Sequence, residues 1–479
     1  MKAFFLQGYD DYDGSTVYWT WTDPDGVDHL CAQDRAVVDA AIAKLRAALP
    51  WEDATLADLD LTELNDQLRA ANLSDALTDW LGWHSGAMET NARLVLTFHR
   101  VATGALADPV TERVLAHEIG QALLPPDLVS ALRAASRAAS REGGIPQRED
   151  DPQGSRLTVL PARSCSAVPW AWLGTAVESD ERLVELADVV IMGPALHRDG
   201  RADLPHPSWE DQCDLPILCV VDPAGGHIPS VLRCDDGVAQ TRLWQAEVDA
   251  TGQQSLRVPG LVNSEAATRR WLFDELRERS AALFLGHVVS ARSDVTGVGD
   301  AAAGKAGLLL APAHHDGSAP DTLTAAEIVS SLIAPDEGDP SRGYAAGSPR
   351  AWQWPPRVGL VACQSGSDLS FAEPFGLVTA ILEAGAELVL ATLWPLFTDT
   401  MFALASGEPA ESFTQTPLFD LSMATRDVLT SPHPFDDFAG WQRSRLAAWR
   451  AAPSLTTAPI TWAAAALHYA PDRTPRPMG

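Results

Sequence analysis

The chain has 479 residues, of which 46% are hydrophobic and 21% are charged, proportions typical of a soluble globular protein with two or three domains. Its formal net charge of −29 argues against nucleic acid and anionic membrane surfaces as partners, because both attract basic proteins. No apolar run approaches the ~18 residues of a membrane span, and the first residues lack the sustained apolar segment of a signal peptide. We therefore expect a cytoplasmic protein.

The cysteines and two short motifs give no indication of a bound cofactor. None of the six cysteines belongs to a C-x-x-C pair, and six are few for a disulfide framework in so long a chain (Cys31, Cys165, Cys213, Cys219, Cys234 and Cys363). Gly299–Lys305 resembles a phosphate-binding loop, but Ala306 follows it where Ser or Thr is needed. His117–Gln121 resembles a zinc-peptidase helix without its second histidine. We expect no metal and no cofactor.

The first 140 residues mix strand and helix patterns. Residues 1–30 contain aromatic, strand-like segments with a turn at Asp23–Gly26, and residues 93–99 have a further strand-like pattern. Helical spacing of apolar residues predicts helices over 34–49, 56–81, 112–124 and 128–139. Residues 141–154 are rich in charge, glycine and proline, which indicates a domain boundary. We therefore predict a smaller α+β N-terminal domain of residues 1–145.

From residue 156 onward, short apolar runs alternate with helical patterns, which predicts an α/β region with a largely parallel sheet and helices on both faces. The predicted strands are Leu157–Leu160, Val189–Met192, Ile217–Val221, Ala281–Gly286, Leu308–Ala311, Val358–Ala362 and Leu388–Leu393. Helices over 418–429 and 438–449, a last strand over 460–469 and an exposed loop over 334–356 complete the prediction. We divide this region into a first half of residues 146–275 and a catalytic half of residues 276–479.

A cysteine and a histidine follow two of these strands. Cys363 comes directly after Val358–Ala362, and His287 comes directly after Ala281–Gly286. Ligands bind at the carboxyl ends of parallel strands, and neighbouring strands lie about 4.8 Å apart. If the two strands are neighbours, the histidine can help Cys363 to become a thiolate nucleophile. The alternative is an inert buried thiol and an ordinary histidine at a strand end.

Six segments, in the right order along the chain, resemble the CHAT family of caspase-like cysteine peptidases related to separases. They are Val168–Leu173 (the family's PWEAL), Leu283–His287 (the histidine strand), Leu323–Ile328 (L-T-A-x-E-I), Val361–Gly366 (S-A-C-x-T-G), Ala384–Ala386 with Leu393–Pro395 (A-G-A and L-W-P), and Thr461–Ala464 (W-A-A). The resemblance implies a caspase-like fold and a cysteine endopeptidase with a His287–Cys363 dyad.

Two positions depart from the family's motifs. Val288 stands where glycine is usual, and the backbone N–H groups of Val288 and Cys363 are the candidate oxyanion donors. Val361 stands where serine is common and where related arginine-specific peptidases have an acidic residue. Because Val361 and Cys363 share one strand face, we expect Val361 at the floor of a P1 pocket that prefers an uncharged side chain. Asp368 or Asp399 would supply the charge if P1 is basic instead.

The resemblance also implies a biological setting. It suggests a regulated protease of a bacterial defence or cell-death pathway, with a protein substrate and a separate sensor or regulatory protein that the N-terminal domain contacts. Two alternatives remain: an inactive CHAT-like scaffold, which Val288 suggests, and a cysteine enzyme that transfers the acyl group instead of hydrolysing it. The tetratricopeptide repeats that often accompany the family are not recognisable.

Overall fold

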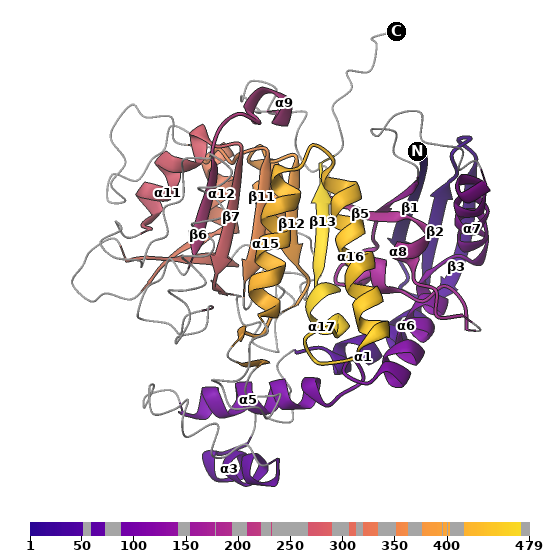
Figure 1. Cartoon of the computed structure of the whole chain (residues 1–479), viewed down its shortest axis with the longest axis horizontal. Helices are drawn as coiled ribbons and strands as arrows, with labels where there is room; N and C mark the ends of the chain where they lie inside the picture. Colours follow the sequence, from indigo (N-terminus) through magenta and orange to yellow (C-terminus); the bar gives the residue numbers. More distant parts are fainter. Residues whose placement is uncertain are drawn as a thin grey trace.

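The structure is a computed structural model that describes residues 1–50, 59–71, 88–141, 154–177, 179–193, 208–221, 231, 267–289, 306–312, 320–333, 351–362, 376–394, 396–399, 401–402 and 416–470. Its framework is a ten-stranded sheet with strand order β3-β2-β1-β4-β5-β13-β12-β11-β7-β6 (Figure 1). The strands are β1 (Lys2–Asp10), β2 (Thr16–Thr22), β3 (Asp28–Asp34), β4 (Ser155–Leu160), β5 (Asp188–Met192), β6 (Ile217–Val221), β7 (Ala281–Gly286), β11 (Arg357–Ala362), β12 (Leu388–Thr392) and β13 (Ala465–Tyr469).

Six of the nine neighbouring strand pairs are parallel, which confirms the predicted α/β class and largely parallel sheet. β13 is the point where the direction changes, because it is antiparallel to β12 and parallel to β5. As a result β12, β11, β7 and β6 all end at one edge of the sheet, and β1, β4, β5 and β13 all end at the other.

The first three strands continue the same sheet and do not form one of their own. β1 pairs with β4 in parallel, from Lys2 opposite Ser155 to Gln7 opposite Leu160. The predicted mixture of strands and helices in the N-terminal part is confirmed. The domain boundaries at residues 145 and 275 stay a prediction, since the sheet crosses the first of them.

The helices of the N-terminal part are α1 (Arg35–Ala48), α3 (Leu61–Ala70), α5 (Met88–Ala102), α6 (Pro109–Leu123) and α7 (Pro126–Arg141). An aspartate carboxylate caps the first turn of α1, α3 and α6. The strand predicted over residues 93–99 is wrong, because these residues lie inside α5. Phe98 on this helix packs against Phe397 with 3.8 Å between ring centroids, so tertiary contacts override the strand-like composition.

The later helices cover both faces of the sheet. They are α8 (Leu183–Leu186), α9 (Trp209–Gln212), α11 (Arg269–Glu275), α12 (Ala325–Ile333), α13 (Leu377–Glu383), α15 (Pro417–Thr430), α16 (Pro434–Ala451) and α17 (Pro459–Trp462). α15 and α16 cross the near face in Figure 1. Side chains of β7 alternate between two cores: Leu283 belongs to the same core as Leu429 of α15, whereas Phe284 belongs to the same core as Ile328 of α12.

A second, antiparallel sheet follows β7 directly. It consists of β8 (Val288–Val289), β9 (Gly307–Leu310) and β10 (Asp321–Thr324), in the order β10-β9-β8. β10 runs without a break into α12. The histidine at the end of β7 therefore stands at the junction of the two sheets.

The structure corrects two further expectations from the sequence. The loop predicted to be exposed over 334–356 ends in packed side chains, because Trp352 and Trp354 are 4% and 2% exposed. The strand predicted over 460–469 begins as the short helix α17, and β13 starts only at Ala465.

The described part of the chain shows neither a membrane span nor a metal cluster. No helix within it combines the length and the hydropathy needed to cross a bilayer. Among the same residues, no three His, Cys, Asp or Glu side chains converge on a possible metal ion. His117 packs so closely on Gly174 that a Cβ added there would come within 2.3 Å of its Nδ1. Gly299–Lys305 lies outside the described residues.

Candidate active site

The carboxyl ends of β7 and β11 lie side by side at one edge of the sheet. The strands are parallel neighbours, and their register ends with Ala362 opposite Gly286. His287 is the next residue after Gly286, and Cys363 is the next residue after Ala362. The strand arrangement on which the predicted pair depends is therefore present, although Cys363 itself lies outside the described residues.

The start of the small sheet holds His287 at this edge. Its carbonyl oxygen accepts the N–H of Leu309 in β9 at 3.0 Å, and its side chain is half-buried. The backbone of His287 is thus fixed by β7 on one side and by β9 on the other. A histidine placed in this way keeps part of its side chain accessible, as a group that exchanges protons with a substrate or with water requires.

The direction of the Val288 N–H follows from the ladder between β8 and β9. Val288 stands opposite Leu308. The next pair along the ladder, His287 and Leu309, is a hydrogen-bonded one, because the N–H of Leu309 donates to the carbonyl of His287. Such pairs alternate with pairs that exchange no hydrogen bond in an antiparallel ladder. The N–H of Val288 therefore points away from β9. The Val288 side chain is 1% exposed and packs into the core on the α12 side.

Val361, the predicted floor of the P1 pocket, is fully buried. It shares a core with Leu283 and Leu285 of β7, on the sheet face that α15 covers. Its surroundings are apolar. Asp368, the first alternative source of charge, lies outside the described residues.

Asp399, the second alternative, is engaged elsewhere. It is 0% exposed, and its carboxylate accepts the N–H of Leu418 at 2.8 Å and that of Phe419 at 3.3 Å. These N–H groups belong to the first turn of α15, so Asp399 caps a helix that begins far along the chain. A buried carboxylate used in this way is poorly placed to bind a basic substrate side chain.

The four cysteines that the structure describes are poor nucleophile candidates. Burial raises the pKa of Cys165 and of Cys219 to about 12. Burial, and then the charge of Asp127, raise the pKa of Cys31. Cys213 is an exposed free thiol, but it precedes β6 and so lies toward the opposite edge of the sheet. Only thiolates attack carbonyls efficiently, so none of these four competes with Cys363 at the edge where His287 stands.

A family model described as "CHAT domain" matches residues 113–467. The chain belongs to the CHAT-domain family. This match confirms the resemblance drawn from the motifs, and with it the caspase-like α/β fold. A comparison with curated proteins gives no match.

Two solved structures resemble this CHAT-domain chain at low identity. Both are crystal structures of the Saccharomyces cerevisiae separase–securin complex, with TM-scores of 0.42 and 0.39 and 10% sequence identity. Each similarity covers 98% of this chain and 30% of the solved chain. The CHAT-domain chain thus spans 30% of the length of the structures it resembles.

The family's L-T-A-x-E-I motif has a clear structural role here. Glu327 accepts the N–H and hydroxyl of Thr324 at 2.9 and 2.8 Å, and the Thr324 hydroxyl accepts the N–H of Glu327 at 3.2 Å, which is a capping box at the start of α12. The other carboxylate oxygen of Glu327 accepts Arg269 Nη1 at 2.8 Å. Arg269 also donates to both carboxylate oxygens of Asp321, at 3.1 and 3.0 Å. The sequence motif indicated the cap, but nothing in the sequence indicated Arg269.

The segment that corresponds to PWEAL is held by a buried ion pair. Arg182 donates to both carboxylate oxygens of Glu112 at 3.0 and 2.9 Å, and both side chains are almost fully buried. The indole N–H groups of Trp172 and Trp449 donate to the same carboxylate. Glu112 therefore connects α6, this segment and α16. Residues so far apart in the sequence gave no signal of this contact.

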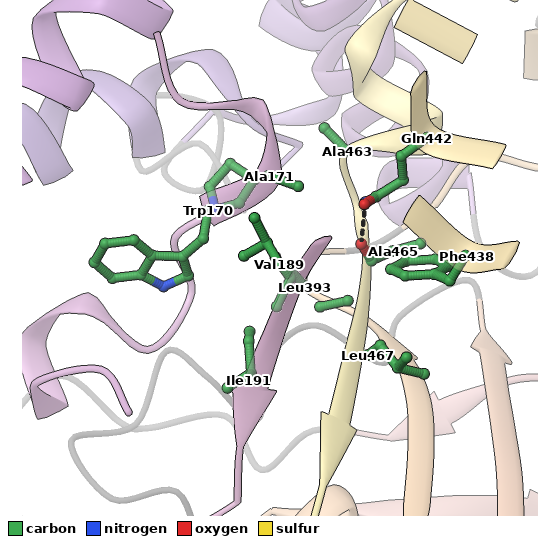
Figure 2. A pocket seen from close by; sticks show the side chains of 12 residues that line it. Trp170, Ala171, Val189, Ile191, Leu393, Phe438, Gln442, Ala463, Ala465 and Leu467 are labelled. Carbon is green, nitrogen blue, oxygen red and sulfur yellow. Dashed lines mark hydrogen bonds between the residues drawn. The ribbon is translucent and has the colours of Figure 1, made fainter. Parts of the chain in front are cut away.

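A small pocket lies where β5 and β13 separate. The two strands pair only at Ile191 and Met192, and toward the edge that carries His287 they diverge around the pocket. Figure 2 shows Gln442 donating to the carbonyl of Ala465 beside apolar side chains. Its open volume is about 10 Å³, close to the least that holds one water molecule. No titratable side chain lines this pocket, so it is not the reaction site.

Proposed function

We propose that this CHAT-domain chain is a cysteine endopeptidase that cleaves protein substrates with a His287–Cys363 dyad. The register of β7 and β11 supports the proposal, because it ends one residue before each member of the pair. The residues that directly follow two neighbouring parallel strands emerge at the same sheet edge. They are about 4.8 Å apart there, which is within reach of side-chain hydrogen bonds.

The proposed reaction has two steps. His287 takes the thiol proton of Cys363, the thiolate forms an S–C bond with the scissile carbonyl, and the imidazolium gives its proton to the leaving amine as the C–N bond breaks. Water, deprotonated by His287, then attacks the thioester carbonyl, the C–S bond breaks, and the imidazolium returns its proton to the sulfur to restore the thiol. The N–H groups of Val288 and Cys363 would stabilise the oxyanion, each contributing about 2–4 kcal/mol to the barrier reduction. The outward direction of the Val288 N–H supports this role.

A thiol-reactive peptide probe tests the dyad. We expect labelling of the wild type to be lost in Cys363→Ala and to slow by about 100-fold or more in His287→Ala, because a general base typically contributes that much. The exposed Cys213 provides a matched control, and Cys213→Ala should be labelled like the wild type. Circular dichroism should show an unchanged fold in each variant. Labelling that survives in Cys363→Ala, or near wild-type turnover in His287→Ala, would refute the assignment.

We further propose that P1 is uncharged, because Val361 is buried among apolar side chains and strand alternation would put Cys363 on the same face. A peptide library should show preference for small or apolar P1 residues. Asp399→Asn keeps an acceptor for the α15 cap and should leave this preference unchanged. A strong preference for arginine or lysine at P1 would contradict the proposal, and its loss in Asp399→Asn would identify the residue that reads the charge.

The biological part of the proposal is a regulated protease of a bacterial defence or cell-death pathway, with a sensor protein that contacts the N-terminal residues. Co-expression with neighbouring gene products, wild type against Cys363→Ala, tests this setting. The second candidate is a catalytically inactive scaffold, the alternative that Val288 in place of the family's usual glycine suggests from the sequence. A protein that binds a partner but is never labelled at Cys363 would support the scaffold.

A further inference from the structure

β3 is the last strand of the ten-stranded sheet on the N-terminal side, and no described strand pairs with its outer edge (Figure 1). Its pairing with β2 runs from Asp28 to Asp34 without a bulge. A straight, unpaired edge of this length is a template on which another strand can add.

The hydrogen-bonding groups on this edge can be assigned from the ladder. The N–H of Asp23 donates to the carbonyl of Val27, and the N–H of Arg35 donates to that of Ser15, both at 3.0 Å, which fixes the alternation from both ends. Odd-numbered residues of β3 therefore bond to β2, and the N–H groups of Asp28, Leu30 and Ala32 face outward. None of these three N–H groups donates to a described residue. Within the described part of the chain, they are available to a partner backbone.

The middle of β3 has none of the usual protection of an edge strand. Side chains alternate between exposed and half-buried, and Leu30 at the centre is 69% exposed. Asp28 and Asp34 lie at the two ends, and no lysine, proline or bulge interrupts the strand between them. Thr20 of β2 stands beside Leu30. The exposed face of the sheet next to this edge therefore has both polar and apolar side chains against which the side chains of one more strand can pack.

The charge around this edge selects the kind of partner. Residues 1–34 contain seven aspartates and one lysine, within a chain of net charge −29. A second copy of this chain fits poorly, because antiparallel pairing of two β3 strands over their full length would place Asp28 opposite Asp34 twice. Like charges directly opposite each other destabilise a sheet, whereas lysine or arginine at those positions would stabilise it.

We propose that β3 is the docking edge for an extended, basic segment of a partner protein, which adds to the sheet as an eleventh strand. The segment would place Lys or Arg beside Asp28 and Asp34 and apolar side chains beside Leu30 and Ala32. This inference goes beyond the proposed peptidase and does not depend on it, because the edge carries none of the residues assigned to cleavage.

The test uses the full chain with Cys363→Ala, so that the probe cannot be cleaved, and a labelled peptide of sequence Lys-Thr-Val-Thr-Val-Thr-Lys. Fluorescence anisotropy should show this peptide binding about tenfold or more tightly than its Glu-Thr-Val-Thr-Val-Thr-Glu counterpart. Leu30→Pro removes one outward N–H that the native ladder does not use, and should weaken binding about tenfold. Leu30→Ala keeps the N–H and should weaken binding only about threefold. Val110→Ala, at an exposed valine of α6, should have no effect.

Hydrogen exchange gives the site-specific readout, since bound peptide should protect the amides of Asp28, Leu30 and Ala32. If Leu30→Pro misfolds, Asp28→Lys keeps every backbone group and should weaken the basic peptide while strengthening the acidic one. The proposal is overturned if the basic peptide does not bind, if it binds without protecting these amides, or if Asp28→Lys leaves the preference unchanged. Wild-type dimers that dissociate in Leu30→Pro would instead identify a second copy of the chain as the occupant.

Discussion

Val288 is the residue at which this chain departs from the usual His-Gly of its family. The structure directs its side chain into the core on the α12 side and its N–H away from β9. The side chain therefore contributes to stability, while the N–H points out of the β8–β9 ladder, as the proposed oxyanion role requires. Crowding of the substrate by this valine, the basis of the scaffold alternative, is disfavoured by a side chain that is only 1% exposed.

Val288→Gly separates the two roles. We expect the free energy of unfolding to fall by about 3 kcal/mol, because a buried branched side chain is lost and backbone freedom is gained. Turnover per labelled active site should stay within about threefold of wild type, since the N–H remains. Urea unfolding and active-site titration measure the two quantities. A large gain in turnover would mean that valine does obstruct the wild-type site.

At the scale of whole elements, buried strands were predictable and contact-dependent segments were not. β6 and β7 occupy the predicted residues because each is a short apolar run between polar neighbours. The candidate site rests on two such strand ends, whose positions the sequence predicted, while the His287–Cys363 pair itself stays a prediction. Residues 93–99 of α5 were predicted as a strand, because local composition does not reveal the contact between Phe98 and Phe397. The small sheet was only partly predicted, since β8 has two residues and depends on β9 for its pairing.

The small sheet contacts His287 through β9, and Arg269 links this sheet to α12. Arg269 pairs with Asp321 of β10 and with Glu327 of α12, and its side chain is 16% exposed. It also donates to the carbonyl of Thr322. One arginine from α11 thus connects β10, which pairs with the β9 strand that holds His287, to α12. We propose that Arg269 and Glu327 are positioning residues, since the contacts described here for both lie within α11, β10 and α12.

Glu327→Gln tests this arrangement through pH. Burial alone would raise the pKa of Glu327, but Arg269 and the Thr324 N–H and hydroxyl outweigh it and hold the pKa below its usual value. A carboxyl group whose pKa is lowered in the folded state stabilises the protein at pH values above its pKa in the unfolded chain. This stabilisation is lost as pH falls through its pKa in the folded state. The variant should be less stable by about 1–2 kcal/mol at pH 7, and the difference should shrink below about pH 4.

The matched control for this prediction is Glu118→Gln, which removes the exposed ion pair with Lys44. Exposed pairs contribute little, so its unfolding free energy should follow the wild type at every pH. Urea unfolding at several pH values supplies both curves. A Glu327→Gln curve parallel to the wild type would show that the charge of Glu327 does not stabilise α12 and the small sheet.

For the molecule as a whole, β13 joins two sets of strands that run in opposite directions. It pairs with β12 over five residues but with β5 at only two positions, so the sheet is weakest at its centre. His468 lies in this short pairing, opposite Val389 on one side and Ile191 on the other. Both neighbours are apolar, and no described group pairs with the buried Nε2 of His468. A charge on His468 would therefore fall where the two halves have the fewest hydrogen bonds.

His468 should make the whole molecule sensitive to acid. Burial lowers its pKa to about 4, against about 6.5 in an unfolded chain, so the folded state favours the neutral ring. The resulting stability is present above about pH 6.5 and is lost as pH falls toward 4, by a total of about 3 kcal/mol. His468→Leu should remove this part of the pH dependence, and urea unfolding at pH 7 and pH 4 measures it. Equal losses in the variant and the wild type would place the acid-sensitive group elsewhere in the sheet.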